Sequence, residues 1–207
     1  MPTEPNKLTR HLSLDEFSAH ARSTWQEQPW NLDGSGMHSR RSDGGASASE
    51  PELVNLDPVT TAVVRGVVPV IDLRNFFDAS FGVLARAIET QRLTTLSPAF
   101  GLYHGSPGET LDLEVGFVTD RMVRPEAGAV VGSLPGGRVA RLTHFGSFDG
   151  LGASWERLGS WIQARGLSAG EDRWETYVTQ PSPGMDPRDL RTELNWPVTV
   201  CQPAARA

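Results

Sequence analysis

Two stretches of the chain carry apolar residues at the spacing of an amphipathic helix. The first, within residues 76–90, places four apolar side chains at i, i+4, i+7 and i+11: Phe77, Phe81, Leu84 and Ile88. The second repeats these intervals with Leu151, Trp155, Leu158 and Ile162. Apolar side chains at this spacing share one face of a helix, so we predict two helices that each bury one face.

Segments rich in β-branched and alternating apolar residues flank both helices. They predict strands over 60–66, 98–105 and 111–120 in the first half, and over 137–146, 173–179 and 190–198 in the second. The order strand–helix–strand–strand therefore occurs twice. We expect an α+β fold, in which a tandem repeat of two strand–helix–strand–strand modules forms a pseudo-twofold antiparallel sheet with a central ligand cleft. Because antiparallel sheets can leave one face uncovered, we expect the helices on one face and the cleft on the other.

The first 52 residues have a different character from the rest. Ser13 and Glu16 form the pattern of a capping box, which predicts a short helix. The stretch that follows is rich in Gly, Ser and charged residues and is typical of a flexible linker. We therefore expect an N-terminal extension over 1–52, with a short helix and a flexible linker, and a folded ligand-binding domain over 53–207.

Composition excludes several classes of function. The chain of 207 residues has a formal net charge of −6, and its basic residues are scattered, which argues against a nucleic-acid partner. No apolar run is long enough for a membrane span, and the start lacks an apolar signal core, so we expect a cytoplasmic protein without membrane partners. A single cysteine, Cys201, and five unpaired histidines predict no metal site, and we expect no cofactor. His144 is expected to be a hydrogen-bonded structural residue.

Several carboxylates interrupt the apolar pattern of the strands. If the apolar residues of each strand face the helices, the set on that face is Phe100, Leu102, Leu113, Val115, Trp174, Val178, Leu194 and Trp196. Alternation then sends five polar side chains to the opposite face: Tyr103, Glu114, Glu175, Tyr177 and Glu193. Glu114 and Glu193 occupy equivalent positions in the two repeats. We predict that all five line the cleft, the alternative being that they meet only water on an exposed sheet.

Three longer segments carry a resemblance to a known family. They are "YHGSPGETLDLEVGFVTD", "THFGSFDGLGASWERLGSWIQARGL" and "WETYVTQPSPGMDPRDLRTELNWPV". In this order they resemble the GyrI-like (DNA gyrase inhibitor-like) effector-binding domains, over residues 53–200. The resemblance implies a pseudo-twofold pair of modules with a ligand cleft between them. It also implies small ligands that are often cationic and aromatic. Members of the family serve as sensor domains of transcription regulators, as stand-alone binding proteins and, in one branch, as hydrolases of cyclopropane-bearing natural products.

Three functions follow from this resemblance and from the carboxylates. The first is a stand-alone binding protein for a lipophilic, cationic or aromatic compound, since clustered carboxylates and aromatic rings attract cations. The second is a hydrolase of strained electrophiles, in which Glu175 or Glu193 activates water and a tyrosine such as Tyr177 donates a proton. The third is regulatory, with a protein partner that is either a transcription regulator or gyrase. The first 52 residues do not resemble a DNA-binding domain, which favours the first two functions.

Overall fold

The computed structural model describes residues 48–180 and 185–200. The predicted N-terminal helix and linker, up to residue 47, and Cys201 lie outside the described residues. The elements are β1 (Glu52–Leu56), β2 (Val59–Pro69), a 3-10 turn (Val70–Asp72), α2 (Leu73–Gln91), β3 (Phe100–His104), β4 (Thr110–Val118), β5 (Val130–Leu134), β6 (Gly137–Phe145), a 3-10 turn (Phe148–Gly150), α3 (Leu151–Ala164), β7 (Leu167–Ala169), β8 (Arg173–Tyr177), a 3-10 turn (Pro187–Asp189) and β9 (Arg191–Val200).

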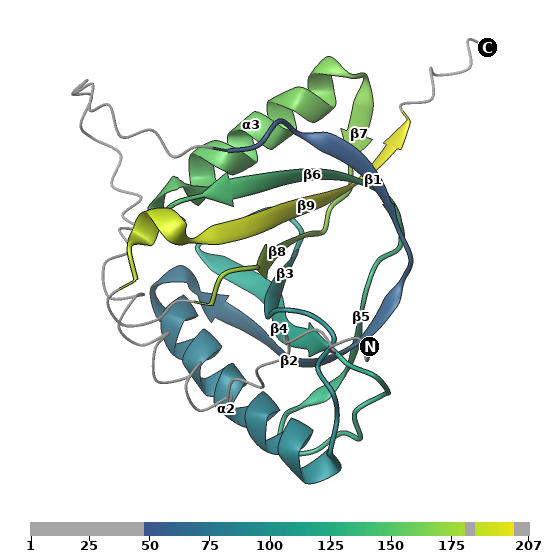
Figure 1. Cartoon of the computed structure of the whole chain (residues 1–207), viewed down its shortest axis with the longest axis vertical. Coiled ribbons are helices and arrows are strands. Elements are labelled where there is room, and N and C mark those ends of the chain that lie inside the picture. The colour runs from purple at the N-terminus through teal and green to yellow at the C-terminus, as the bar shows by residue number, and fades with distance from the viewer. Residues whose placement is uncertain (1–47, 181–184, 201–207) are drawn as a thin grey trace, which may run out of the picture.

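The predicted repeat is confirmed in the order of the elements and in the sheet. One module is β2–α2–β3–β4 and the other is β6–α3–β8–β9, and the strands pair in the order β1–β6–β9–β8–β3–β4–β2–β5. The two modules therefore meet where β3 pairs with β8, at the centre of the sheet. Every described pairing between named strands is antiparallel. Figure 1 shows the sheet curled into a half-barrel, with α2 and α3 on its outer side.

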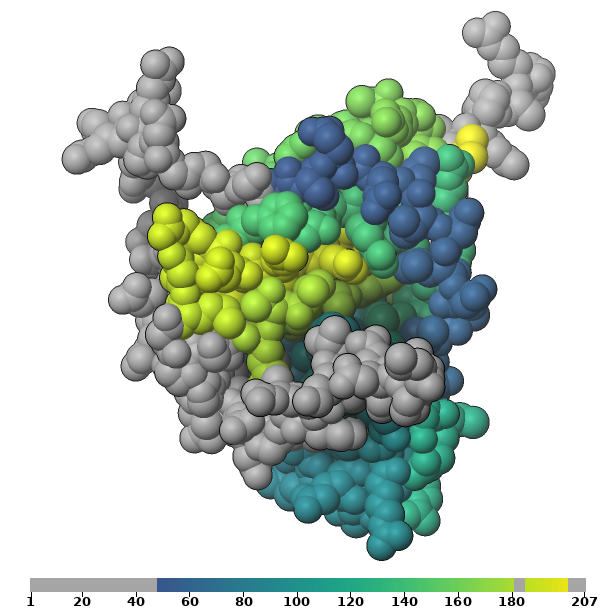
Figure 2. Space-filling view, in the orientation of Figure 1, coloured from purple at the N-terminus to yellow at the C-terminus, as the bar shows by residue number. Residues whose placement is uncertain are grey.

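Three strands were not predicted from the pattern. β1 precedes β2 in the chain but pairs with β6 of the other module, and β5 precedes β6 but pairs with β2. The strand that precedes each module in the chain therefore pairs with the edge of the other module. The short strand β7 pairs with the end of β9. In Figure 2, β1, β6 and β9 are packed side by side over the upper part of the molecule, with α2 and β5 at the lower end.

Two hydrophobic clusters fill the two sides of the sheet. The larger lies between the sheet and the helices and includes Phe77, Phe81, Leu113 and Leu158. The smaller lies on the inner side of the half-barrel and consists of Val63, Phe100, Leu102, Leu134, Val139 and Trp174. The prediction that Phe100, Leu102 and Trp174 face the helices is therefore wrong. They cover the inner face, which is the face on which the pattern predicts the cleft.

Packing begins a few residues before the predicted domain boundary at 53. The backbone N–H of Ser49 donates to the carbonyl oxygen of Thr143 at 2.8 Å, and Ser49 Oγ accepts from the N–H of Thr143 at 2.9 Å. Arg157 on α3 donates to the Ala48 carbonyl at 3.2 Å and to the Glu50 carboxylate at 2.7 Å. Residues 48–52 therefore belong to the folded unit.

No helix among the described residues is both long and apolar enough to cross a bilayer.

Candidate ligand-binding site

A cavity of about 640 Å³ lies on the helix-bearing side of the sheet. Its walls come from α3, from the first residue of α2, and from residues of strands β3, β4, β8 and β9. The lining residues include Leu73, Tyr103, Leu111, Phe148, Leu151, Trp155, Arg173, Glu175 and Trp196. The expected position of the cleft, on the face away from the helices, is thus corrected, because α3 forms one of its walls.

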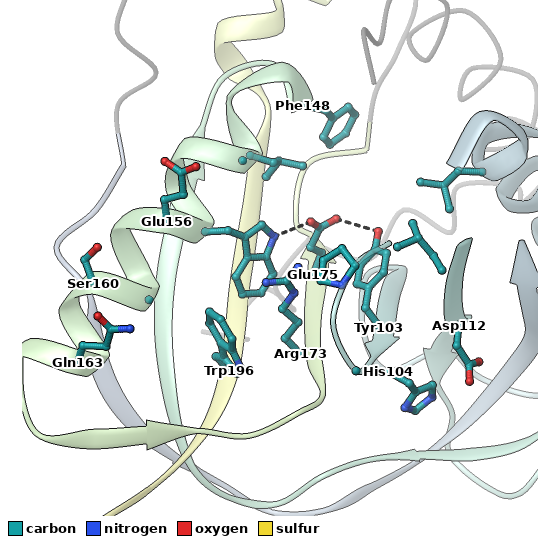
Figure 3. A pocket seen from close by; sticks show the side chains of 18 residues that line it. Tyr103, His104, Asp112, Phe148, Glu156, Ser160, Gln163, Arg173, Glu175 and Trp196 are labelled. Carbon is teal, nitrogen blue, oxygen red and sulfur yellow. Dashed lines mark hydrogen bonds between the residues drawn. The ribbon is translucent and has the colours of Figure 1, made fainter. Parts of the chain in front are cut away.

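The carboxylate of Glu175 lies at the centre of this cavity wall and is surrounded by donors (Figure 3). Glu175 is 6% exposed. Its Oε1 accepts a hydrogen bond from Trp155 Nε1 at 2.9 Å. Its Oε2 accepts from the Tyr177 hydroxyl at 3.0 Å and from the Tyr103 hydroxyl at 3.3 Å. Both oxygens of a buried carboxylate are therefore satisfied by neutral groups, as a buried polar group requires.

Strand alternation and register explain why these groups meet. Glu175 and Tyr177 stand two apart on β8, so both point to the helix side. Gly101 on β3 lies directly opposite Glu175. A Cβ at Gly101 would lie 3.0 Å from the Tyr177 hydroxyl and 3.5 Å from that of Tyr103. The absence of a side chain at position 101 leaves the space in which the two hydroxyls reach the carboxylate.

Burial governs the acid–base properties of this cluster. It raises the pKa of Glu175, and the hydrogen bonds from Trp155, Tyr177 and Tyr103 oppose that rise because they stabilise the ionised carboxylate. Burial, together with the negative charge nearby, raises the pKa of both tyrosine hydroxyls well above the usual value. The tyrosines therefore remain proton donors, while Glu175 is a base whose proton affinity is increased.

An aromatic wall stands beside the carboxylate. The Trp155 ring on α3 meets the Trp196 ring on β9 edge to face, with centroids 5.6 Å apart. The Trp196 indole N–H donates to the Gly170 carbonyl at 2.8 Å, which holds that ring in place. The Arg173 guanidinium lies over both rings, 4.8 Å from the Trp155 centroid and 5.2 Å from the Trp196 centroid. The site thus combines two indole rings, a guanidinium and a buried carboxylate.

The five predicted site residues do not share one face. Tyr103 and Glu175 line the cavity, and Tyr177 supports Glu175 from behind, packed against Phe77 and Phe148. Glu114 lies on the opposite side of the sheet, because it pairs directly with Leu102, whose side chain covers the inner face. There Glu114 accepts from Arg65 Nε at 2.7 Å and lies 3.5 Å from His104 Nε2.

Glu193 also departs from the predicted arrangement. Its neighbour Leu194 belongs to the helix-side cluster, so Glu193 points to the inner side, where one oxygen lies 3.6 Å from Arg141 Nη1. Among the described residues the cavity wall contains neither Glu114 nor Glu193. The equivalence of these two positions in the repeats is real, but it places them on the face without the cavity.

Several residues of the site are not among the predicted ones, and three of them form its aromatic and basic wall. The sequence pattern predicts Trp155 and Trp196 in the core, yet both are half-buried and line the cavity. Arg173 is the third. One signal was available for it, since Arg173, Glu175 and Tyr177 alternate along β8 and must share a face.

His144 has the structural role predicted for it. It is fully buried, its Nε2 lies 2.9 Å from the Ser147 carbonyl oxygen, and its Nδ1 lies 2.8 Å from Ser154 Oγ. A carbonyl only accepts, so Nε2 donates and a neutral ring accepts from the Ser154 hydroxyl through Nδ1. Within residues 48–180 and 185–200, no group of His, Cys, Asp and Glu side chains is arranged to hold a metal ion.

The fold recurs in solved structures. The C-terminal domain of EcmrR superposes with a TM-score of 0.64 at 19% identity, covering 73% of this chain and 98% of that domain. SAV2435 bound to tetraphenylphosphonium superposes with a TM-score of 0.53 at 17% identity, covering 73% of this chain and 94% of that one. A hydrolase from Listeria innocua has a TM-score of 0.54 at 14% identity, covering 72% and 91% of the two chains.

Sequence comparison gives the family directly. No curated protein sequence matches the chain. The GyrI-like small molecule binding domain matches over residues 49–199, which includes both modules except the last residue of β9, and every residue of the site described above. This chain therefore belongs to the family of GyrI-like small molecule binding domains.

Proposed function

We propose that this protein binds a lipophilic aromatic compound in the cavity between α3 and the central strands. The observation that carries the proposal is the buried Glu175 carboxylate, held by three neutral donors beside two indole rings, in a cavity of about 640 Å³. Cavities of this size, mostly apolar and with a few convergent polar groups, are typical of small-molecule sites.

The lining supports an aromatic ligand. Trp155, Trp196 and Phe148 offer ring surfaces, and Leu73, Leu111 and Leu151 supply the remaining apolar wall. Indole rings bind flat apolar molecules through offset or edge-to-face contacts. SAV2435, which has the same fold, has been solved with the lipophilic cation tetraphenylphosphonium, and this favours ligands of similar size for the present cavity.

A thermal-shift screen with lipophilic aromatic compounds, cationic and neutral, tests the proposal. Ligand at about 100 times its Kd stabilises the folded state by about 2.7 kcal/mol, which raises the melting temperature by several degrees. Each hit is then titrated calorimetrically against Trp155→Ala and Trp161→Ala. Both tryptophans lie on α3 and each has an arginine stacked on it, but Trp161 is outside the cavity. We expect only Trp155→Ala to weaken binding, and equal losses in both variants would contradict the site.

A second candidate function is supported by the acid–base state of Glu175. A carboxylate whose pKa is raised by burial is a stronger base than an exposed one, and is therefore better suited to accept a proton from water. That water would attack a strained ring carbon, the carbon–carbon bond would break, and its electron pair would move to a conjugated oxygen of the substrate. Tyr103, which lines the cavity, would protonate that oxygen. The protein would then be a hydrolase of strained electrophiles.

Product analysis separates the two functions. Hits from the screen that carry a cyclopropane ring are incubated with the protein and with Glu175→Gln, and the products are identified by mass spectrometry. Ring opening with addition of water, lost in Glu175→Gln, supports the hydrolase. Recovery of the intact compound from a protein that binds it supports the binding protein.

A further inference from the structure

Arg173 occupies the position in this cavity where an external cation would be expected. Its guanidinium lies over Trp155 at 4.8 Å and over Trp196 at 5.2 Å, so the ring faces of the aromatic wall already hold a positive charge. Figure 3 shows the side chain running alongside Trp155 toward the cavity. The attraction of an indole face for a cation is thus satisfied by the protein itself.

The other group in the cavity that could attract a cation is the Glu175 carboxylate, and it also has partners within the protein. Glu175 accepts three hydrogen bonds from neutral donors, and it also interacts with the charge of Arg173, two residues away on the same face of β8. The other acids of the wall, Asp112 and Glu156, are exposed and point away from Glu175 in Figure 3. A cationic ligand in the interior would therefore meet a guanidinium before it met an unneutralised anion.

The Arg173 guanidinium, in contrast, has N–H donors that are not used within the protein. Within residues 48–180 and 185–200, the Arg173 guanidinium forms no hydrogen bond or salt bridge with a side chain or a carbonyl, although Arg173 is half-buried and lines the cavity. Arginine carries five N–H donors in a rigid planar arrangement, and the Arg173 nitrogens are not among the buried side-chain atoms that lack a partner, so they are open to solvent or to a ligand in the cavity. A ligand oxygen beside the aromatic wall would supply one.

We propose that Arg173 determines the specificity of this site, and that it selects neutral aromatic compounds with a hydrogen-bond acceptor oxygen against permanent cations. The inference rests on the proposed binding function of the cavity. The ligand's ring lies against Trp155 and Trp196 and its oxygen accepts from Arg173. A permanent cation of the same size binds only if Arg173 leaves the aromatic wall.

Two matched probes test this: tetraphenylphosphonium, a cation, and triphenylphosphine oxide, a neutral compound with one acceptor oxygen. Both are titrated calorimetrically at neutral pH into the full chain, into Arg173→Gln, and into Arg165→Gln. Arg165 is the control, because its guanidinium stacks on the Trp161 ring at 4.0 Å and neither residue lines the cavity. Arg173→Lys is a second variant, which keeps the charge and lacks the planar donors.

We expect the unmodified protein to bind the oxide at least about tenfold more tightly than the cation. Arg173→Gln should reverse this preference, with weaker oxide binding and tighter cation binding, while Arg165→Gln behaves as the unmodified protein. Arg173→Lys should still reject the cation and should lose affinity for the oxide. A preference for the cation in the unmodified protein, or a preference unchanged in both Arg173 variants, would overturn the role of Arg173 alone. If neither the unmodified protein nor any variant binds either probe, both the role of Arg173 and the proposed function are overturned.

Discussion

Leu102 and Glu114 lie directly opposite each other on strands β3 and β4, so their side chains leave the same face of the sheet. Leu102 belongs to the cluster on the inner side of the half-barrel, and Glu114 is therefore buried there at 7% exposure. Its partner is Arg65, whose Nε lies 2.7 Å from the carboxylate. Glu114 is thus a structural partner of β2 and lies on the far side of the sheet from the cavity.

The position of Glu114 leads to a stability prediction. Glu114→Gln should lower the free energy of unfolding by about 1 kcal/mol, because Arg65 loses a charged acceptor but remains half exposed to water. Ligand affinity should be unchanged. Urea denaturation and calorimetric titration measure the two quantities. Glu193→Gln is the control and should cost less, since Arg141 is 3.6 Å away and both side chains are more accessible than Glu114. A lower ligand affinity of Glu114→Gln, without any loss in the free energy of unfolding, would contradict this assignment.

Glu175 should make stability depend on pH. Burial raises its pKa in the folded state above the ordinary value of 4.5. Between those two pKa values the folded protein binds more protons than the unfolded chain, so the free energy of unfolding falls as the pH rises through this window. Glu175→Gln does not titrate there. We therefore expect the stability of the unmodified protein, relative to Glu175→Gln, to decrease as the pH rises above the ordinary carboxyl pKa of 4.5, measured by urea denaturation at a series of pH values. A constant difference across this range would mean that the pKa is not raised.

Gly101 should be required for the arrangement around Glu175. In Gly101→Ala the new methyl group would lie 3.0 Å from the Tyr177 hydroxyl and 3.2 Å from the Phe77 ring, so Tyr177 must shift and its hydrogen bond to Glu175 weakens. We expect lower ligand affinity and lower stability. Gly82→Ala on α2 is the control, because a methyl group there meets nothing within 4 Å. It should raise stability by roughly 0.5–1 kcal/mol, as alanine does within a helix. Equal behaviour of the two variants would contradict the packing described here.

Phe81 and Trp155 occupy equivalent positions in the helical pattern but should differ in their contribution to stability. Phe81 is 1% exposed and belongs to the larger cluster, so Phe81→Ala should cost about 3–5 kcal/mol. Trp155 is half-buried and borders the cavity, so Trp155→Ala should cost at least about 1 kcal/mol less, and it should weaken ligand binding. Chemical denaturation compares the two. A larger loss for Trp155→Ala would mean that this ring is a core residue.

The start of the folded unit can be tested by truncation. A chain that begins at residue 53 loses the bonds that Ser49 makes with Thr143 and those that Arg157 makes with Ala48 and Glu50. We expect it to be less stable, by about 1–3 kcal/mol, than a chain that begins at residue 48. The chain from residue 48 should match the full protein in ligand affinity. Identical melting temperatures for the two truncated chains would restore the boundary at 53.

Local patterns along the chain were enough to predict both described helices, six of the strands and the repeat. Apolar residues at helical spacing identified α2 and α3, and alternating segments identified β2, β3, β4, β6, β8 and β9. These are local patterns, and their periods follow from the geometry of a helix and a strand alone. Strands β1 and β5 are as long as β3 and β8 but were missed; each pairs with the opposite module, so its place depends on contacts between residues far apart in the chain.

The face of each strand that borders the site follows from how the strands pair and how the helices pack on them. Alternation gives two sets of side chains for every strand, but register between neighbours decides which sets coincide. The pairing of Leu102 with Glu114, and of Gly101 with Glu175, assigned Glu114 to the inner face and Glu175 to the cavity. In the same way Trp155 and Trp196, apolar residues expected in the core, became a binding wall because α3 and β9 leave a space between them and β3. The pattern identifies a side chain as apolar, and whether it meets the core or a cavity depends on how the elements pack.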